Sequence, residues 1–131
     1  MIDLPAVAFD DMIAHAQANL PNEACGLVAL SDNKVQRVYC VENVTPSPDT
    51  FTVDPVAHHD AIRDADAMGW EVGGSFHSHP NGNAEPSQTD VAKSPGSEWL
   101  HIIVGLGATE PTIGFYRIGT RVSRCRFQIA G

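Results

Sequence analysis

Hydrophobic positions along the chain follow a helical spacing in some segments and form short apolar runs in others. The change from one pattern to the other predicts where helices and strands begin and end. Residues 10–20 carry apolar side chains at helical spacing between Asp10 or Asp11, either of which can cap a helix, and Pro21. Residues 54–69 begin with Asp54 and Pro55, an N-cap followed by proline at the first helical position, and end at Gly69. The spacing therefore predicts two helices. The positions expected to face inward are Phe9, Ile13, Ala16 and Leu20 in the first helix and Val56, Ala57, Ile62, Ala65 and Met68 in the second.

Short apolar runs between and after these helices predict the strands of a sheet. They cover residues 24–30, 35–44, 70–79, 99–107, 112–118 and 122–129, and the segment SQTDVAK at 87–93 predicts a short third helix. Helices alternate with strands at first and strands dominate at the end, which predicts an α/β fold with a mixed β-sheet flanked by helices. Residues 1–131 are expected to form a single domain. A chain of this size can bury roughly two-thirds of its surface without a metal or a disulfide.

Charge is divided unevenly along the chain. The net charge is −8, yet all sixteen acidic residues lie before residue 111, whereas the last twenty-one residues hold four arginines, which are Arg117, Arg121, Arg124 and Arg126. An acidic body repels phosphate backbones, so nucleic acid is not expected as a partner. The arginines are expected to form a solvated strand face.

Location and redox state follow from what the sequence lacks. No apolar run approaches the roughly 18 residues of a membrane span, and no basic and apolar leader opens the sequence. The cysteines, Cys25, Cys40 and Cys125, are odd in number and far apart, as is typical of free or buried thiols in a reducing compartment. We therefore expect a cytoplasmic protein with no membrane partner.

The segment FHSHPNGNAEPSQTD at 76–90 carries the residues best suited to chemistry. His77 and His79 are two apart on a predicted strand, so their imidazoles point to the same face, and Pro80 helps to end the strand beside them. Asp90 follows eleven residues after His79, in the first turn of the predicted third helix, where its carboxylate can return toward the strand end. Two histidines and one carboxylate with an open fourth position are typical of hydrolytic zinc sites.

Each part of this pattern also has an ordinary structural interpretation. A pair of histidines two residues apart is often simply exposed, and Ser87 with Asp90 is also what a helix-capping box looks like. Glu23 stands at the entry of an apolar strand, where a glutamate is usually solvated. These interpretations explain each part separately but not their occurrence together.

Taken jointly, Glu23, the sequence His77-Ser78-His79-Pro80, six intervening residues, and then Ser87 and Asp90 resemble the JAMM motif of the JAB1/MPN metallopeptidases. The resemblance covers about residues 9–117. The segments NEACG and PSQTD are especially similar to small bacterial members that act on ubiquitin-like sulfur-carrier proteins. This resemblance implies a JAB1/MPN-like fold, with a layering similar to that of cytidine deaminases.

The resemblance also implies a role for each residue. His77, His79 and Asp90 would hold one zinc ion, and Glu23 would accept a proton from the activated water and deliver it to the leaving amine. Ser87 would hydrogen-bond the oxyanion. His15, His58, His59 and His101 lie outside the motif and are not expected to bind metal.

The implied substrate is a ubiquitin-like or sulfur-carrier β-grasp protein that ends in Gly-Gly, with hydrolysis of the bond after this tail. A chain of 131 residues has no room for large insertions, so the extended tail is expected to bind along a sheet edge in an open groove. Three questions stay open: which carrier is cleaved, whether the bond is a peptide, an isopeptide or a cysteine adduct, and whether the chain forms a homodimer.

Two alternatives of other classes remain. One is a catalytically silent MPN scaffold that only binds protein partners. The other is a non-peptidase zinc hydrolase such as a deaminase, although the H-x-E and P-C-x-x-C patterns of zinc deaminases are absent from the sequence.

Overall fold

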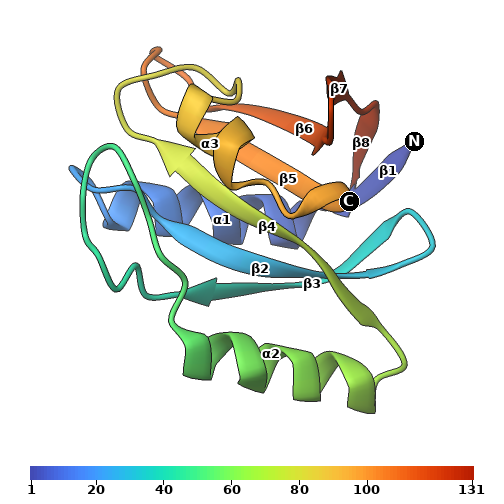
Figure 1. Ribbon diagram of the computed structural model, residues 1–131. Coiled ribbons are helices and arrows are strands. Elements are labelled where there is room, and N and C mark those ends of the chain that lie inside the picture. The colour runs from blue at the N-terminus through green and yellow to red at the C-terminus, as the bar shows by residue number, and fades with distance from the viewer.

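The computed structural model describes residues 1–131 and contains one eight-stranded sheet with three helices (Figure 1). The elements in chain order are β1 (Ile2–Pro5), α1 (Ala6–Ala18), β2 (Cys25–Ser31), β3 (Lys34–Val41), α2 (Pro55–Ala67), β4 (Glu71–His79), α3 (Gln88–Lys93), β5 (Gly96–Gly105), β6 (Thr112–Ile118), β7 (Val122–Arg124) and β8 (Phe127–Ala130). The strand order is β7-β6-β5-β4-β2-β3-β1-β8. Strands β4 and β5 run parallel, as do β1 with β3 and with β8, while the other pairs are antiparallel. The predicted α/β fold with a mixed sheet is confirmed.

The two long helices lie on opposite faces of the sheet. Phe76 of β4 is fully buried in one core cluster with Met12 of α1, so α1 covers that face. Tyr39 of β3 points to the other face, where its hydroxyl donates to the Asp64 carboxylate of α2 at 2.6 Å. Figure 1 shows α1 behind the central strands and α2 below β3. His77 is adjacent to Phe76 on β4 and therefore points to the α2 face.

The beginning of the chain differs from the sequence prediction. Helix α1 begins at Ala6, four residues earlier than expected, and its N-cap is Pro5 rather than Asp10 or Asp11. The preceding residues form the short strand β1, which the sequence analysis missed. Strand β1 pairs with β8 at the far end of the chain, a long-range contact that local hydrophobic spacing does not reveal.

The predicted strand at 122–129 is also wrong in detail. The chain divides there into β7, which pairs with β6, and β8, which pairs with β1, so these two short strands lie at opposite ends of the strand order. The sheet curls enough for the two residues between them to connect its edges, and the Cys125 amide donates to the Phe115 carbonyl there at 2.8 Å. Phe127 stacks on Phe115, with ring centroids 4.5 Å apart.

The inward faces of both helices were predicted only in part. In α1 the buried residues are Ala8, Met12 and Ala16, and Leu20 lies beyond the helix and is exposed. In α2 only Ala61 and Ala65 are buried, while Val56, Ile62 and Met68 are exposed. The residues of α2 that are buried against the sheet are thus small alanines. The larger apolar side chains of α2 consequently remain outside.

Candidate metal centre and active site

The two motif histidines lie at the carboxyl end of β4, beside the sheet centre. Their strand is paired on both sides, with β2 and with β5, so its backbone is fixed by hydrogen bonds along both edges. His77 is buried and its ring stacks on Phe51, with centroids 4.7 Å apart and the planes inclined by 22°. His79 is the last residue of the strand, and its Nδ1 lies 2.8 Å from the Asn83 carbonyl oxygen. That carbonyl can only accept, so Nδ1 carries the proton and Nε2 keeps its lone pair.

Asp90 comes to the histidines from the short helix α3. The Ser87 hydroxyl accepts the Asp90 amide at 3.1 Å, and the Asp90 carboxylate Oδ2 accepts the Ser87 amide at 2.9 Å, which together form a capping box. The same Oδ2 atom lies 3.1 Å from Nε2 of His77 and 3.1 Å from Nε2 of His79. The capping interpretation is therefore correct and compatible with the metal interpretation, because the cap orients the carboxylate toward the histidines.

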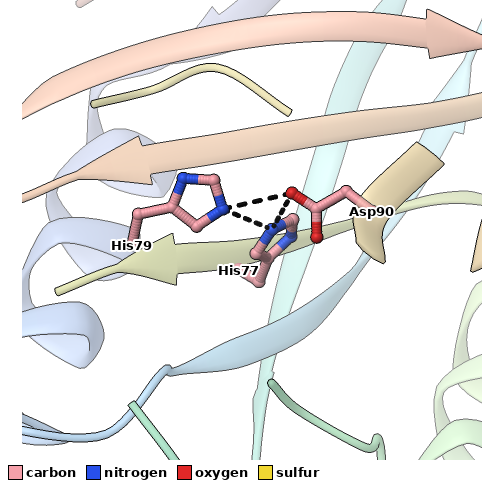
Figure 2. A group of neighbouring side chains, drawn as sticks. All are labelled: His77, His79 and Asp90. Carbon is pink, nitrogen blue, oxygen red and sulfur yellow. Dashed lines mark hydrogen bonds and ion pairs between the residues drawn. The ribbon is translucent and has the colours of Figure 1, made fainter. Parts of the chain in front are cut away.

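The three side chains converge on one point, as Figure 2 shows. The two imidazole Nε2 atoms are 3.2 Å apart, so the donor atoms form a nearly equilateral triangle. A point about 2.0–2.1 Å from all three atoms exists beside this triangle, and that is the usual distance from zinc to imidazole nitrogen or carboxylate oxygen. Three lone-pair donors directed at one point repel each other unless a proton or a cation lies between them. The donor set consequently fits a single divalent metal ion.

The protonation states of these residues also suit a metal. Burial lowers the pKa of His77 and so favours the neutral imidazole, against the opposing effect of Asp90. Burial would raise the pKa of Asp90, but hydrogen bonds from His77 and His79 outweigh it and hold that pKa far below its usual range. For His79, the contacts with Asp90 and the Asn83 carbonyl outweigh burial and raise the pKa. A cation at this point would take the place of the proton that these contacts favour.

Glu23 lies next to the metal-binding triangle, in the short connection that leads into β2. It is only 5% exposed, and its backbone is held from three sides. Its amide donates to the Ser47 carbonyl at 2.8 Å, and its carbonyl accepts from the Asn43 side-chain amide at 3.0 Å. The adjoining Ala24 amide donates to the Ser78 hydroxyl at 2.8 Å. The usual expectation of a solvated glutamate is therefore wrong here.

Burial raises the pKa of Glu23 to about 7. Within this net value, the negative charges of Asp90 and Asp49 also raise the pKa, whereas the positive charges of His79 and Lys93 lower it. A carboxyl group with a pKa near the working pH can both accept and release a proton.

Ser87 is exposed at the edge of the site. Its oxygen accepts the Asp90 amide, which uses an oxygen lone pair and leaves the hydroxyl hydrogen free to donate. Ser87 lines an open hollow together with Glu23 and His79. The structure thus brings together all five residues that the sequence analysis singled out.

Several residues that support the site were missed. The Ser78 hydroxyl fixes the backbone next to Glu23, because it accepts a hydrogen bond from the Ala24 amide. Asn43 bonds the Glu23 carbonyl, and Asn83 sets the tautomer of His79. The fold brings Asn43 and Asn83 to the site, and no spacing in the sequence indicates their roles. Ser78 alone had a sequence signal, because it stands between the two histidines.

Two hollows adjoin the triangle on different sides. The open one, the Glu23 hollow, has two prolines but no larger aliphatic or aromatic residue in its lining, which consists of Glu23, Pro48, Asp49, His79, Pro80, Asn81, Gly82 and Ser87. The other, the His77 pocket, has a volume of about 290 Å³ and is bounded by β2, β4, β5, α3 and the loop before α2. Its lining includes His77, Asp90, Phe51, Trp99 and Lys93. His58 and His101, two of the histidines outside the motif, also line this pocket but do not belong to the metal-binding triangle.

Two histidines at the end of a central strand and an aspartate from α3, with their donor atoms directed at one point, form a group that could hold a metal ion, as is typical of metal-dependent hydrolases. The chain also matches the model of the family described as "Prokaryotic homologs of the JAB domain" over residues 5–119. The chain therefore belongs to this family, as the motif indicated.

The relatives agree with this assignment. The chain is 34% identical over 92 residues to a Thermus thermophilus protein named "Probable TtuB-protein conjugate cleaving protease", covering 70% of this chain and 62% of that protein. It is 30% identical over 98 residues to the CysO-cysteine peptidase of Mycobacterium tuberculosis, covering 71% of this chain and 65% of the relative. The matched regions thus span slightly less than two-thirds of these relatives.

Solved structures support the fold. A solution structure of a Desulfitobacterium hafniense protein superimposes with a TM-score of 0.89 and 32% identity, covering 99% of this chain and 93% of that one. A JAB1/MPN domain protein from Archaeoglobus fulgidus gives a TM-score of 0.66 at 16% identity, with coverage of 100% and 98%. The expected JAB1/MPN-like fold is confirmed. None of the three helices is both long and apolar enough to cross a membrane.

Proposed function

We propose that the chain is a zinc-dependent peptidase or isopeptidase that hydrolyses the bond after the C-terminal Gly-Gly of a ubiquitin-like or sulfur-carrier protein. One observation carries this proposal: the converging Nε2 and Oδ2 atoms of His77, His79 and Asp90 lie beside a buried glutamate whose pKa is near neutral. The names of the relatives supply the substrate class. The three free cysteines agree with a cytoplasmic location.

The metal site supplies the electrophilic part of the chemistry. His77, His79 and Asp90 would hold the ion, which, when bound, would activate water and polarise the scissile carbonyl. The neutral form of His77 and the ionised form of Asp90 are the forms that bind a cation. The stacked Phe51 ring and the Asn83 carbonyl hold the imidazoles in place. These contacts fix the donors before substrate arrives.

Glu23 acts as the general base and acid in this proposal. Its carboxylate takes a proton from the attacking water and returns it to the nitrogen of the leaving amine, a role typically worth about 10²–10⁴ in rate. The hydrogen bonds from Asn43 and to Ser47 fix its backbone. Ser87 donates its free hydroxyl hydrogen to the oxyanion that forms on the carbonyl oxygen.

The Glu23 hollow suits an extended Gly-Gly tail. Its lining is mostly polar, and its apolar members, Pro48 and Pro80, are small. A tail without side chains fits such a hollow because its backbone can approach closely. The carrier itself would remain outside, held by its tail.

A metal titration followed by a cleavage assay tests this proposal. His77→Ala is expected to lose stoichiometric zinc and all cleavage of a Gly-Gly carrier fusion while remaining folded. His59→Ala is the matched control, because His59 is an exposed histidine of α2 outside the site. A His77→Ala variant that binds zinc as the parent protein does would contradict the ligand assignment. Full zinc binding without cleavage of any carrier fusion would favour the silent scaffold.

A further inference from the structure

The loop at residues 43–53 contacts every element that contributes to the proposed site. Glu23 precedes β2, the two histidines lie on β4, and Asp90 lies on α3. The loop connects β3 with α2 and is green in Figure 1. Its ends are held together, since Asn43 and Val53 form an isolated β-bridge. A loop whose ends are joined in this way packs as one unit.

The 43–53 loop holds the backbone of Glu23 from two sides. The Glu23 amide donates to the Ser47 carbonyl at 2.8 Å, and the Glu23 carbonyl accepts from the Asn43 side-chain amide at 3.0 Å. Both partners of this backbone segment therefore belong to the same loop. A displacement of the loop would move the proposed general base.

The same loop also borders the metal-binding triangle. The Phe51 ring stacks on His77 with centroids 4.7 Å apart. The neighbouring Thr50 accepts a hydrogen bond at its hydroxyl from the Lys93 ammonium at 3.2 Å, and Lys93 lies three residues after Asp90 on α3. Two adjacent loop residues thus contact a histidine of the triangle and the helix that carries the aspartate.

Asn43 connects these contacts to each other. It is only 4% exposed, and its amide nitrogen donates to the Glu23 carbonyl at 3.0 Å and to the Thr50 carbonyl at 3.1 Å. Its oxygen accepts the backbone amides of Thr45 and Thr52 at 3.1 Å and 3.0 Å. Both amide hydrogens and both oxygen lone pairs are therefore used within the protein. A buried side chain that is satisfied in this way holds the groups it joins in one arrangement.

We propose that Asn43 and Phe51 are positioning residues that couple the general base to the metal site through the 43–53 loop. Phe51 acts on His77 by restricting the rotation of its imidazole. Asn43 acts on Glu23 through the backbone carbonyl and on His77 through Thr50 and the adjoining Phe51. Loss of either side chain thus speeds the release of bound zinc, and loss of Asn43 also displaces the base. This inference rests on the proposed function, because it presupposes zinc at the triangle and Glu23 as the base.

The rate at which the loaded protein releases zinc to an excess of a colorimetric chelator measures the effect on His77 without any substrate. Phe51→Leu is expected to speed this release about 3- to 10-fold, the effect of one aromatic pair. Asn43→Ala is expected to speed it by a similar factor, because it acts on the metal through Phe51. The double variant should then release zinc no faster than either single variant, since both substitutions remove the same contact.

Two matched variants control for general loosening of the fold. Phe127→Leu removes another stacked, half-buried aromatic ring, which packs on Phe115 in the core on the α1 face, opposite His77. Asn33→Ala removes an exposed asparagine between β2 and β3, at the other end of β2 from Glu23. Both controls should release zinc at the parent rate.

Cleavage of a Gly-Gly carrier fusion at saturating zinc measures the effect on the base. Asn43→Ala is expected to lower kcat about 10- to 100-fold with little change in KM, because the base is misplaced while the substrate still binds. A merely structural role for Asn43 would lower the Tm and leave both kcat and the rate of zinc release unchanged. Phe51→Leu keeps the proposal testable if Asn43→Ala does not fold.

The outcomes distinguish this inference from the proposed function. Release of zinc at the parent rate by Phe51→Leu, or equal acceleration in Phe127→Leu, would overturn the inference and leave the proposed function intact. A double variant that shows the product of the two single factors, or an unchanged kcat in Asn43→Ala, would do the same. A parent protein that binds no zinc, or that cleaves no carrier fusion when loaded with zinc, would overturn both.

Discussion

Replacement of Glu23 by glutamine should separate catalysis from stability. The carboxyl group is 5% exposed, and burial raises its pKa from 4.5 to about 7. Folding therefore favours the protonated carboxyl group, and the ionised form destabilises the metal-free protein. Glutamine has nearly the same shape and carries no charge at any pH. The variant should consequently lose activity and gain stability.

The pH dependence of this gain follows from the two pKa values. Below pH 4.5 the carboxyl group is protonated in both states and the substitution changes little. As the pH rises from 4.5 to 7, the unfolded chain loses its proton before the folded protein does, so the parent protein loses stability. The calculated penalty is about 1 kcal/mol at pH 5 and about 3 kcal/mol at pH 8. For a domain of this size, 3 kcal/mol corresponds to about 10 °C in Tm.

Thermal and urea unfolding of both proteins in chelator, at pH 5 and pH 8, measures this difference. Chelation matters because a bound cation would itself lower the pKa of Glu23. We expect the stability advantage of Glu23→Gln to grow with pH, and zinc-loaded Glu23→Gln to lose turnover by several orders of magnitude. An advantage that is the same at both pH values, or one that shrinks as the pH rises, would refute the reasoning about the buried carboxyl group.

Three further predictions test how the site is held. Chelation of the metal should leave the far-ultraviolet circular dichroism unchanged, because the core cluster around Phe76 does not include the metal ligands. It should lower the Tm, because a ligand that binds only the folded state stabilises that state. An unfolded metal-free protein would contradict this prediction. Gly26→Ala should destabilise the fold by about 3 kcal/mol in urea unfolding, since a Cβ atom at this position would overlap the Phe76 ring and the Tyr39 carbonyl. A loss of stability under about 1 kcal/mol would show that the strands can move apart to make room. Ser78→Ala should lower stability by about 1–3 kcal/mol and also reduce kcat, because the buried Ala24 amide beside Glu23 loses its hydrogen-bond acceptor. An unchanged kcat would show that Ser78 does not help to position Glu23. The control is Ser123→Ala, because Ser123 is exposed.

Local patterns predicted most of the fold. The strand that ends at His79 and Pro80 and the helix that begins at Asp54 and Pro55 were predicted closely, because proline and a capping aspartate act within a few residues. Strand β1 and the division of the last strand were missed, because the pairing of β1 with β8 joins residues at opposite ends of the sequence. The spacing of hydrophobic residues within a segment does not indicate which distant strand that segment pairs with.

The sequence predicted the residues of the candidate site more completely than it predicted the loops and pocket around them. Their spacing places His77 and His79 on one face of a strand and Asp90 in the first turn of a helix. The structure brings the donor atoms of these three residues together. The burial of Glu23 and the pocket around Trp99 depend on how loops pack, which no residue spacing specifies.

Mass spectrometry of a Gly-Gly carrier fusion, before and after incubation with zinc-loaded protein, tests the central claim most directly. Chelated parent protein and zinc-loaded Glu23→Gln serve as controls in the same experiment. The proposal predicts that only the zinc-loaded parent protein converts the fusion to the carrier ending in Gly-Gly and a separate leaving group. An intact fusion after incubation with fully zinc-loaded parent protein, or equal cleavage in the chelated sample, would contradict it.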